Sequence, residues 1–241
     1  MLLVVCDEND VSALWAAEAL RARGLFPTVL TGADLAAVQR WEHRVGAGAA
    51  GWEILLNGGG VLRSRDVRGV LNRLPTVPWT WQRRIGGVDR DYAIQEMYAF
   101  YLSWLYALPG RKLNPPTPQG LCGNPRHPSA WAALAARVGL PARPFRQTSE
   151  DAPELFWRTQ RPHAAVTLQV VGARIVGPTS LVRSHAEACL LLSKAAGAPL
   201  LGVDFMPGSD GVWRMTDASI MPDLPRGGDE LADALAEAFA E

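Results

Sequence analysis

Lysine is nearly absent from this sequence. Only Lys112 and Lys194 occur in 241 residues, so arginine carries almost all of the positive charge. Cysteine is also scarce: Cys6, Cys122 and Cys189 lie far apart and form no CxxC pair. Such spacing indicates neither a disulfide framework nor a zinc site. Chemistry that depends on lysine has few residues to use, and chemistry that depends on a cysteine cluster has none.

Long apolar runs and an excess charge are missing as well. No apolar run reaches the length of a membrane-spanning helix, and the first residues lack the basic segment of a signal peptide. The formal net charge is zero at pH 7, so composition gives no reason to expect nucleic acid or an anionic membrane as a partner. With 48% hydrophobic and 20% charged residues, the chain is predicted to be a globular cytoplasmic protein of one large or two small domains.

The first thirty residues have the pattern of a strand, a helix and a second strand. Residues 2–5 form a short apolar run, Asp10 is placed to cap a helix that ends near Gly24, and residues 26–30 form the next strand. This order predicts a βαβ unit in a parallel sheet. No glycine-rich fingerprint follows Cys6, so a dinucleotide site is not expected there.

Short strands and one long helix are predicted next. Residues 52–56, 61–63 and 70–74 read as strands, with a hairpin turn between the first two at residues 57–60. Residues 91–108 have apolar side chains at helical spacing, and their many aromatic rings indicate a packed core more strongly than a surface for stacking nucleic-acid bases. The proline-rich stretch 113–118 then predicts a boundary between domains 1–112 and 113–241.

The second half alternates helices and strands and ends in a hairpin. Helices are predicted at 129–138, 182–196 and 229–239, and strands at 166–171, 173–176, 200–205 and 212–218. The turn at Asp210-Gly211 makes the last two strands antiparallel neighbours, so Asp204 and Asp217 are expected to face one point. Two such carboxylates suit Mg²⁺, although their spacing alone favours a surface hairpin with solvated acidic residues. Two histidines, His43 and His185, are predicted to be surface residues in helical stretches.

The order of these motifs resembles that of ATP-grasp proteins of the RimK/glutathione-synthetase type. Three segments carry the resemblance: Asp7-Glu8-Asn9-Asp10, the block from Leu113-Asn114-Pro115 through Trp131 to Gly139-Leu140-Pro141, and Gly202-Val203-Asp204-Phe205 followed by residues 210–222. The resemblance implies an α/β N-terminal domain followed by an α+β ATP-grasp domain. It also implies Mg-ATP as cofactor and the joining of a carboxylate to an amine through an acyl phosphate.

The resemblance implies a set of candidate ligands, and this chain differs from the family at several of those positions. It implies Asp204, Asp217 and Ser219 as the metal-binding residues, although family members have Glu and Asn where this chain has Asp217 and Ser219. The two lysines that bind phosphate in the family are absent, and Arg126 and Arg174 are the candidate cofactor-binding residues in their place.

The small lobe that covers the nucleotide in the family has no room here. Residues 148–164 are too few for that lobe and its glycine-rich loop, so the ATP-grasp domain is predicted to be shortened. Arg158 and Arg161, which lie in this stretch, are further available phosphate partners.

Three functions are compatible with these residues. The first, which we favour, is a shortened and degenerate ATP-grasp protein that binds a peptide or protein partner and has no assigned catalytic residue. The second is an active ATP-dependent carboxylate–amine ligase with a rearranged site. The third ignores the resemblance and places a nucleophilic Cys122 beside His127 or His163 in a hydrolase or transferase. The sequence predicts neither the identity of that partner nor the oligomeric state.

Overall fold

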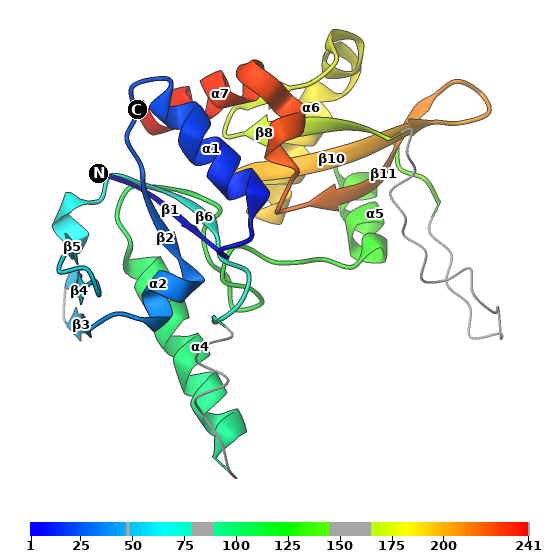
Figure 1. Ribbon diagram of the computed structural model, residues 1–241. Helices are drawn as coiled ribbons and strands as arrows, with labels where there is room; N and C mark the ends of the chain where they lie inside the picture. Colours follow the sequence, from blue (N-terminus) through cyan, green and yellow to red (C-terminus); the bar gives the residue numbers. More distant parts are fainter. Residues whose placement is uncertain (47–48, 79–88, 145–164, 241) are drawn as a thin grey trace.

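The computed structural model describes residues 1–46, 49–78, 89–144 and 165–240. Within these ranges the strands form three sheets, two of four strands and one of three. Figure 1 shows the parallel sheet and the three-stranded sheet on one side of the molecule and the last hairpin on the other. The predicted α/β first half and α+β second half are confirmed. None of the described helices combines the length and apolar character needed to cross a membrane.

The first sheet is parallel throughout. Its strands lie in the order β2 (Thr28–Thr31), β1 (Leu2–Cys6), β6 (Gly69–Arg73) and β7 (Arg111–Leu113). Helix α1 (Val11–Arg21) connects β1 to β2, which confirms the predicted βαβ unit. The Asp10 carboxylate caps this helix by accepting a hydrogen bond from the Ala13 N–H at 3.0 Å. A short helix, α2 (Gly32–Ala36), follows β2.

The second sheet is an antiparallel meander of three strands. Its strands are β3 (Arg40–Gly46), β4 (Ala49–Leu55) and β5 (Val61–Arg63), followed by the short 3-10 helix η1 (Ser64–Asp66). The predicted turn after β4 is confirmed by the hydrogen bond from the Leu56 N–H to the Gly60 carbonyl at 2.8 Å. The helical setting predicted for His43 is wrong: the residue lies on β3, half-buried, with its Nε2 atom 2.9 Å from the Ser103 hydroxyl.

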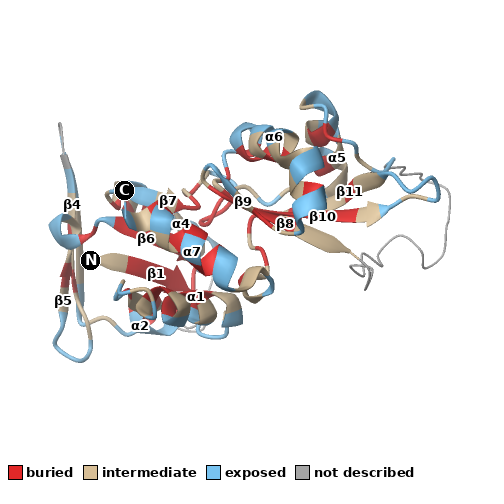
Figure 2. Cartoon of the chain, turned by 90° about the horizontal axis from the view of Figure 1, so that it is seen from above, coloured by how far each residue is buried: buried red, intermediate tan, exposed pale blue. Residues whose placement is uncertain are grey.

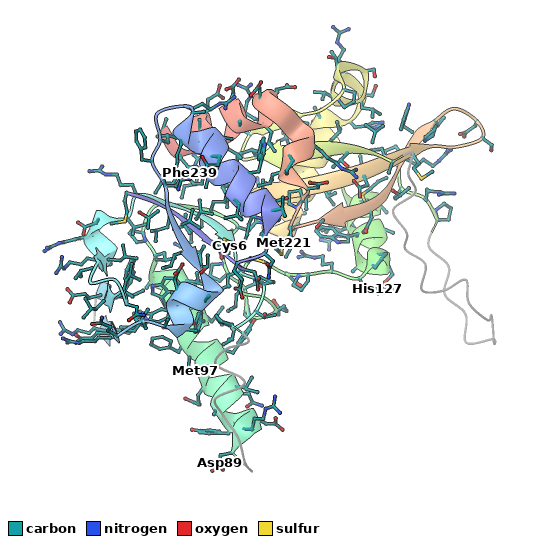
Figure 3. All side chains as sticks on the ribbon, viewed as in Figure 1. Cys6, Asp89, Met97, His127, Met221 and Phe239 are labelled. Atoms are coloured by element: carbon teal, nitrogen blue, oxygen red, sulfur yellow. The ribbon has the colours of Figure 1, made fainter. Side chains whose placement is uncertain are left out.

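Helix α4 (Arg90–Ala107) packs its second half against one face of this sheet. The Trp41 ring lies edge-on to Phe100, Tyr101 and Trp104, with ring centroids 4.8 to 5.2 Å apart. These contacts confirm that the aromatic rings form a packed core. Burial is confined to the second half of the helix, and the first half, with Met97 only half-buried, extends away from the body (Figures 1 and 3).

The third sheet is antiparallel and carries the second half of the chain. Its strands lie in the order β11 (Trp213–Ser219), β10 (Leu200–Pro207), β8 (Val166–Val171) and β9 (Arg174–Val176). Helices α5 (Pro128–Arg137) and α6 (Thr179–Ala196) cover one face and form a core with it that includes Trp131, Leu192 and Val203. The sheet therefore contains the predicted strands 166–171, 200–205 and 212–218.

The two halves of the chain share a core. Val4 and Leu71 of the first sheet pack with Leu200 of the third and with Leu231 and other residues of the last helix, α7 (Gly228–Ala240). The 3-10 helix η2 (Leu224–Gly227) leads into α7. Figure 2 shows these buried strands meeting near the middle of the molecule. The division of the chain at residue 113 remains a prediction, and the two halves are not independently packed.

Candidate functional site

The hairpin β10–β11 places the two predicted acids directly opposite each other. Asp204 pairs with Asp217 in the antiparallel register, and a bulge interrupts the ladder immediately afterwards, between Asp204 and Phe205. Directly opposed residues of an antiparallel pair project from the same face of the sheet. The expectation that Asp204 and Asp217 lie on neighbouring strands and face one side is therefore confirmed.

Strand β8 extends this arrangement into two rows of residues. Thr167, Asp204 and Asp217 form one row across β8, β10 and β11, and two residues further along, Gln169, Gly202 and Ser219 form the next. Figure 1 shows these strands side by side. The alternating residues Leu168, Val203 and Ala218 point to the other face, into the core with α5 and α6. One face of the third sheet is thus polar at this end.

Asp204 is the most enclosed of the three candidate ligands. Asp204 is only 4% exposed, and the Thr167 hydroxyl donates a hydrogen bond of 2.5 Å to its Oδ1 atom. The Thr216 hydroxyl donates to the Asp204 carbonyl at 3.2 Å. A buried carboxylate needs such donors because it loses its hydration on folding.

Asp217 and Ser219 also make hydrogen bonds within the chain. The Asp217 Oδ1 atom accepts a hydrogen bond from the Ala218 N–H at 2.8 Å, and the Ser219 Oγ atom accepts one from the Met221 N–H at 3.1 Å. In the next row, Gly202 leaves space that Pro222 fills, because a Cβ atom added there would lie 2.9 Å from the proline Cβ. The loop after β11 is therefore folded over the second row.

The three predicted magnesium ligands are two carboxylates and one hydroxyl. The described part of the chain contains no group of three or more His, Cys, Asp or Glu side chains that could hold a metal ion. Mg²⁺ takes six oxygen ligands and usually keeps several waters, and these three groups, each of which also accepts a hydrogen bond from the chain, would supply at most three of the six. The assignment of Asp204, Asp217 and Ser219 as metal ligands remains a prediction.

A hollow of about 460 Å³ opens beside the same sheet face. Its lining includes Thr167, Gln169, Gly177, Arg226 and Glu230. Gln169 is 2% exposed. Its amide nitrogen donates to the Asp223 carbonyl at 2.8 Å, and its Oε1 atom has no hydrogen-bond partner among the described residues. Neither Thr167 nor Gln169 is among the site residues predicted from the sequence, although they are the polar positions of the alternating strand 166–171.

The two candidate cofactor-binding arginines lie elsewhere. The Arg174 guanidinium forms an ion pair of 2.8 Å with Glu237 of α7, and Arg174 is opposite Val171, which pairs with the first residue of β10 and not with Asp204. The Arg126 guanidinium lies 5.1 Å from the centre of the Trp131 ring. Trp131 packs into the core on the face opposite the carboxylates. A role of either arginine in nucleotide binding remains a prediction that these positions do not favour.

The geometry of Cys122 argues against a thiol nucleophile. Cys122 is 3% exposed, and burial raises its pKa to about 11, so the thiol is protonated at neutral pH. His127 lies at the start of α5 (Figure 3), where its Nδ1 atom accepts a hydrogen bond from the Ser129 N–H at 3.3 Å. Arg158, Arg161, His163 and the predicted short segment 148–164 lie outside the described residues.

Comparison with known proteins identifies the fold. No family model matches the chain, and no curated protein matches it. Among solved structures it is similar to the macrocyclase MdnC of Microcystis aeruginosa MRC bound with the precursor peptide MdnA, with a TM-score of 0.72, 15% identity, and 99% of each chain covered.

Two further structures are similar along the whole chain. One is a RiPP-associated ATP-grasp ligase of Chryseobacterium gregarium in complex with ADP and a leader and core peptide (TM-score 0.67, 9% identity, 99% of this chain and 96% of that chain). The other is the ATP-grasp ligase PsnB complexed with minimal precursor, Mg and ADP (TM-score 0.60, 17% identity, 100% of this chain and 98% of that chain). At these identities the likeness concerns the fold, and this chain has an ATP-grasp-like fold.

Proposed function

We propose that this protein is an ATP-grasp-like binding module for a peptide or protein partner, with little or no ligase activity of its own. The observation that carries the proposal is the pair of changed ligand positions on β11: Asp217 and Ser219 stand where the family that the sequence resembles has Glu and Asn, so a shorter carboxylate and a hydroxyl replace two of its metal ligands. The scarcity of lysine supports it too, because the family's two phosphate-binding lysines are missing.

The expected loss of activity is large. Removing one preorganised donor that stabilises charge in a transition state commonly costs on the order of 10²–10³ in rate. This chain lacks two lysines of the family and has two altered ligand positions, Asp217 and Ser219. Even with strong non-additivity, little turnover is expected.

The similar structures support a peptide as the class of partner. MdnC is bound with a precursor peptide, the Chryseobacterium gregarium ligase with a leader and core peptide, and PsnB with a minimal precursor. Binding a peptide requires neither the lysines nor a metal ion. A cytoplasmic location belongs to the same proposal, supported by three cysteines that are all free thiols.

The alternative is an active ATP-dependent carboxylate–amine ligase with a rearranged site. One observation favours it, namely the direct opposition of Asp204 and Asp217 on the polar face of the third sheet. Mg²⁺ at phosphate-binding sites is often held by one or two carboxylates together with the phosphates themselves. Asp204 and Asp217 would hold such an ion, which would neutralise charge on the transferring phosphoryl group.

Calorimetric titration of the full chain with ATP, with and without Mg²⁺, distinguishes the two functions. It is paired with a phosphate-release assay across amino-acid and peptide acceptors and with binding to an array of short peptides without ATP. We expect weak ATP binding or none, no acceptor-dependent ADP, and retention of peptides on the array.

The variant Asp204→Ala is the informative one, and Asp91→Ala, in the exposed first turn of α4, is its control. Micromolar ATP binding that Asp204→Ala abolishes and Asp91→Ala preserves, together with ADP formation only when an acceptor is present, would establish the ligase and overturn the proposal. A chain that retains no peptide would also overturn it.

A further inference from the structure

The outward face of the sheet β3–β4–β5 carries a cluster of arginines at the end of the molecule opposite the hairpin β10–β11. Both views of the chain place this sheet and the hairpin far apart (Figures 1 and 2). A hollow of about 350 Å³ lies on the face, and its charged lining residues are Arg40, Glu42, Arg44, Glu53, Arg63 and Arg65. Four guanidinium groups thus surround it with two carboxylates, a net charge of +2 (four minus two).

The register explains why these side chains share a face. Glu42 lies opposite Glu53, which lies opposite Arg63, and Arg44 lies opposite Gly51. The alternate residues, including Trp41 and Trp52, point to the other face and pack against α4. Gly51 has no side chain at the centre of the hollow. A Cβ atom added there would meet only the Ser64 Oγ atom, at 3.8 Å.

The carboxylates of the face do not use all the donors of its arginines. Glu42 bonds to both Arg40 and Arg44, and its exposed side-chain fraction is 31%, whereas those of Arg40 and Arg44 are 65% and 79%. Arg63 pairs with Glu53 at 2.8 Å, and Arg65, with 78% of its side chain exposed, is 4.0 Å from Asp66. Each guanidinium has five N–H donors, so several remain available to further acceptors.

The spacing of the arginines sets the size of a ligand. Strands β3 and β5 are two strand spacings apart, about 10 Å, and Arg40 and Arg44 are separated by about 13 Å along β3. A single small anion cannot reach groups so far apart. Glutamate or aspartate side chains at alternate positions of an extended peptide repeat every ~7 Å, and guanidinium groups bind carboxylates through paired hydrogen bonds.

We propose that this arginine face binds an acidic segment of the peptide or protein partner. The inference rests on the proposed peptide-binding function and names the chemistry of the partner and the surface it contacts. Strand β3 adds a second element of recognition, because among the described strands it pairs only with β4 and is therefore an edge strand, to which an extended chain can add.

A nucleic acid is the other polyanion to consider, and the face is poorly suited to it. Single-stranded nucleic acids stack their bases on exposed aromatic rings. Trp52 borders the hollow but is only 4% exposed, and its ring packs toward Trp104 with ring centroids 6.0 Å apart, so it offers no exposed ring face to a base. Glu42 and Glu53 at the centre of the face would also repel a continuous row of phosphates, whereas acidic side chains of a peptide can be placed between them.

The test is fluorescence anisotropy with the full chain and a labelled peptide of alternating glutamate and threonine. The matched probe has glutamine in place of every glutamate, and a single-stranded oligonucleotide serves as competitor. The informative variant is Arg44→Glu with Arg65→Glu, exposed positions on β3 and η1 that both line the hollow. The control is Arg137→Glu with Arg183→Glu, exposed positions on α5 and α6 that change the net charge equally.

We expect the acidic peptide to bind the wild type at least about tenfold more tightly than the glutamine peptide, with affinity falling as salt is raised. The Arg44→Glu/Arg65→Glu variant should lose at least about tenfold in affinity and the control pair less than about twofold. Equal binding of the two peptides, an unaffected Arg44→Glu/Arg65→Glu variant, or tighter binding of the oligonucleotide would overturn the inference.

Failure here is distinguishable from failure of the proposed function. If array peptides bind but none depends on Arg44 and Arg65, the binding module stands and this surface is excluded as its docking site. If ATP-dependent ligation is found, the proposed function falls, while the anisotropy result still decides whether the arginine face recognises acidic chains.

Discussion

The chemical properties of single side chains in this protein depend on the groups immediately around them. Asp204 would be an ordinary solvated acid on an isolated hairpin. In the folded chain it is 4% exposed and accepts the Thr167 hydroxyl at 2.5 Å. Asp210, at the exposed turn of the same hairpin, shows the opposite setting: hydrogen bonds from Arg214, at 2.6 and 2.7 Å, hold the pKa of this carboxyl well below its usual range. The two acids lie six positions apart on one hairpin and have different chemistry.

The three cysteines allow a prediction at the same scale. Burial raises the pKa of Cys6 and Cys189 to about 12 and that of Cys122 to about 11. At pH 8 each native thiol should therefore react with iodoacetamide at least about a hundredfold more slowly than the same thiol in urea. Mass spectrometry of the alkylated peptides measures each site. Fast labelling of any of the three in the native chain would show that this thiol is not buried with a raised pKa.

The sign of the pH dependence follows from the same shifts. Because the folded thiols keep their protons while unfolded thiols lose theirs above about pH 9, the unfolded chain binds fewer protons in that range. The free energy of unfolding should fall between about pH 9 and pH 11, by up to about 1.4 kcal/mol per pH unit for each thiol. Replacing Cys189 by alanine should reduce that slope, which urea unfolding at successive pH values measures.

Elements meet through close backbone contacts as well as through side chains. After α4 the chain turns at Gly110, whose φ is +74°, and enters β7 beside β6. A Cβ atom at this position would lie 1.8 Å from the Arg68 carbonyl oxygen. Only glycine permits this approach, so the last strand of the parallel sheet depends on one residue at the end of α4.

The substitution Gly110→Ala tests this contact, and Gly24→Ala is its matched control. Gly24 has a similar φ of +79°, but no atom lies within 4 Å of an added Cβ. Gly24→Ala should lower the free energy of unfolding by about 1 kcal/mol, from backbone strain alone. Gly110→Ala should lower it by about 4 kcal/mol or more, because backbone atoms must also move. Urea unfolding followed by circular dichroism gives both values, and equal losses would show that the carbonyl contact is unimportant.

Buried polar groups connect the two halves of the molecule where they meet. Arg73 at the end of β6 is 4% exposed, bonds to the Asp10 carboxylate at 2.7 Å, and donates to the Pro222 carbonyl at 3.1 Å. Figure 3 shows Cys6, its register partner on β1, near Met221 at this junction. Asn114 is fully buried and bonds to the Leu200 carbonyl, the Leu200 N–H and the Ile220 carbonyl, at 2.8, 2.8 and 3.0 Å.

The shared core and these bonds predict that the two halves unfold together. Cys6 lies in the shared core and Cys189 in the core of the second half, so alkylation in increasing urea should give the same midpoint at both sites. Asn114→Ala should shift both midpoints together and lower the free energy of unfolding by about 3 kcal/mol or more, because three buried backbone groups lose their partner. The control Asn9→Ala, at an exposed position, should shift neither. Separate midpoints would show that the shared core and the core of the second half do not unfold as one unit.

Local order follows directly from the sequence because it depends on neighbours along the chain. The cap at Asp10, the βαβ unit, the turn at residues 57–60 and the hairpin that brings Asp204 to Asp217 were all predictable. The strand β3 was missed, although its alternation of Trp41, His43 and Val45 with charged residues is a strand signal, because its outward face is rich in arginine and glutamate.

Only the tertiary structure decided which of these residues share a surface. The row of Thr167, Asp204 and Asp217 requires the pairing of β8 with β10, across more than thirty residues of chain. The location of Arg174 with Glu237, away from the carboxylates, depends on register in the same way, and so does the gathering of three arginines on the sheet β3–β5, beside Arg65 of η1. Register and packing between distant segments are set by long-range contacts, which hydrophobic period and turn chemistry do not specify.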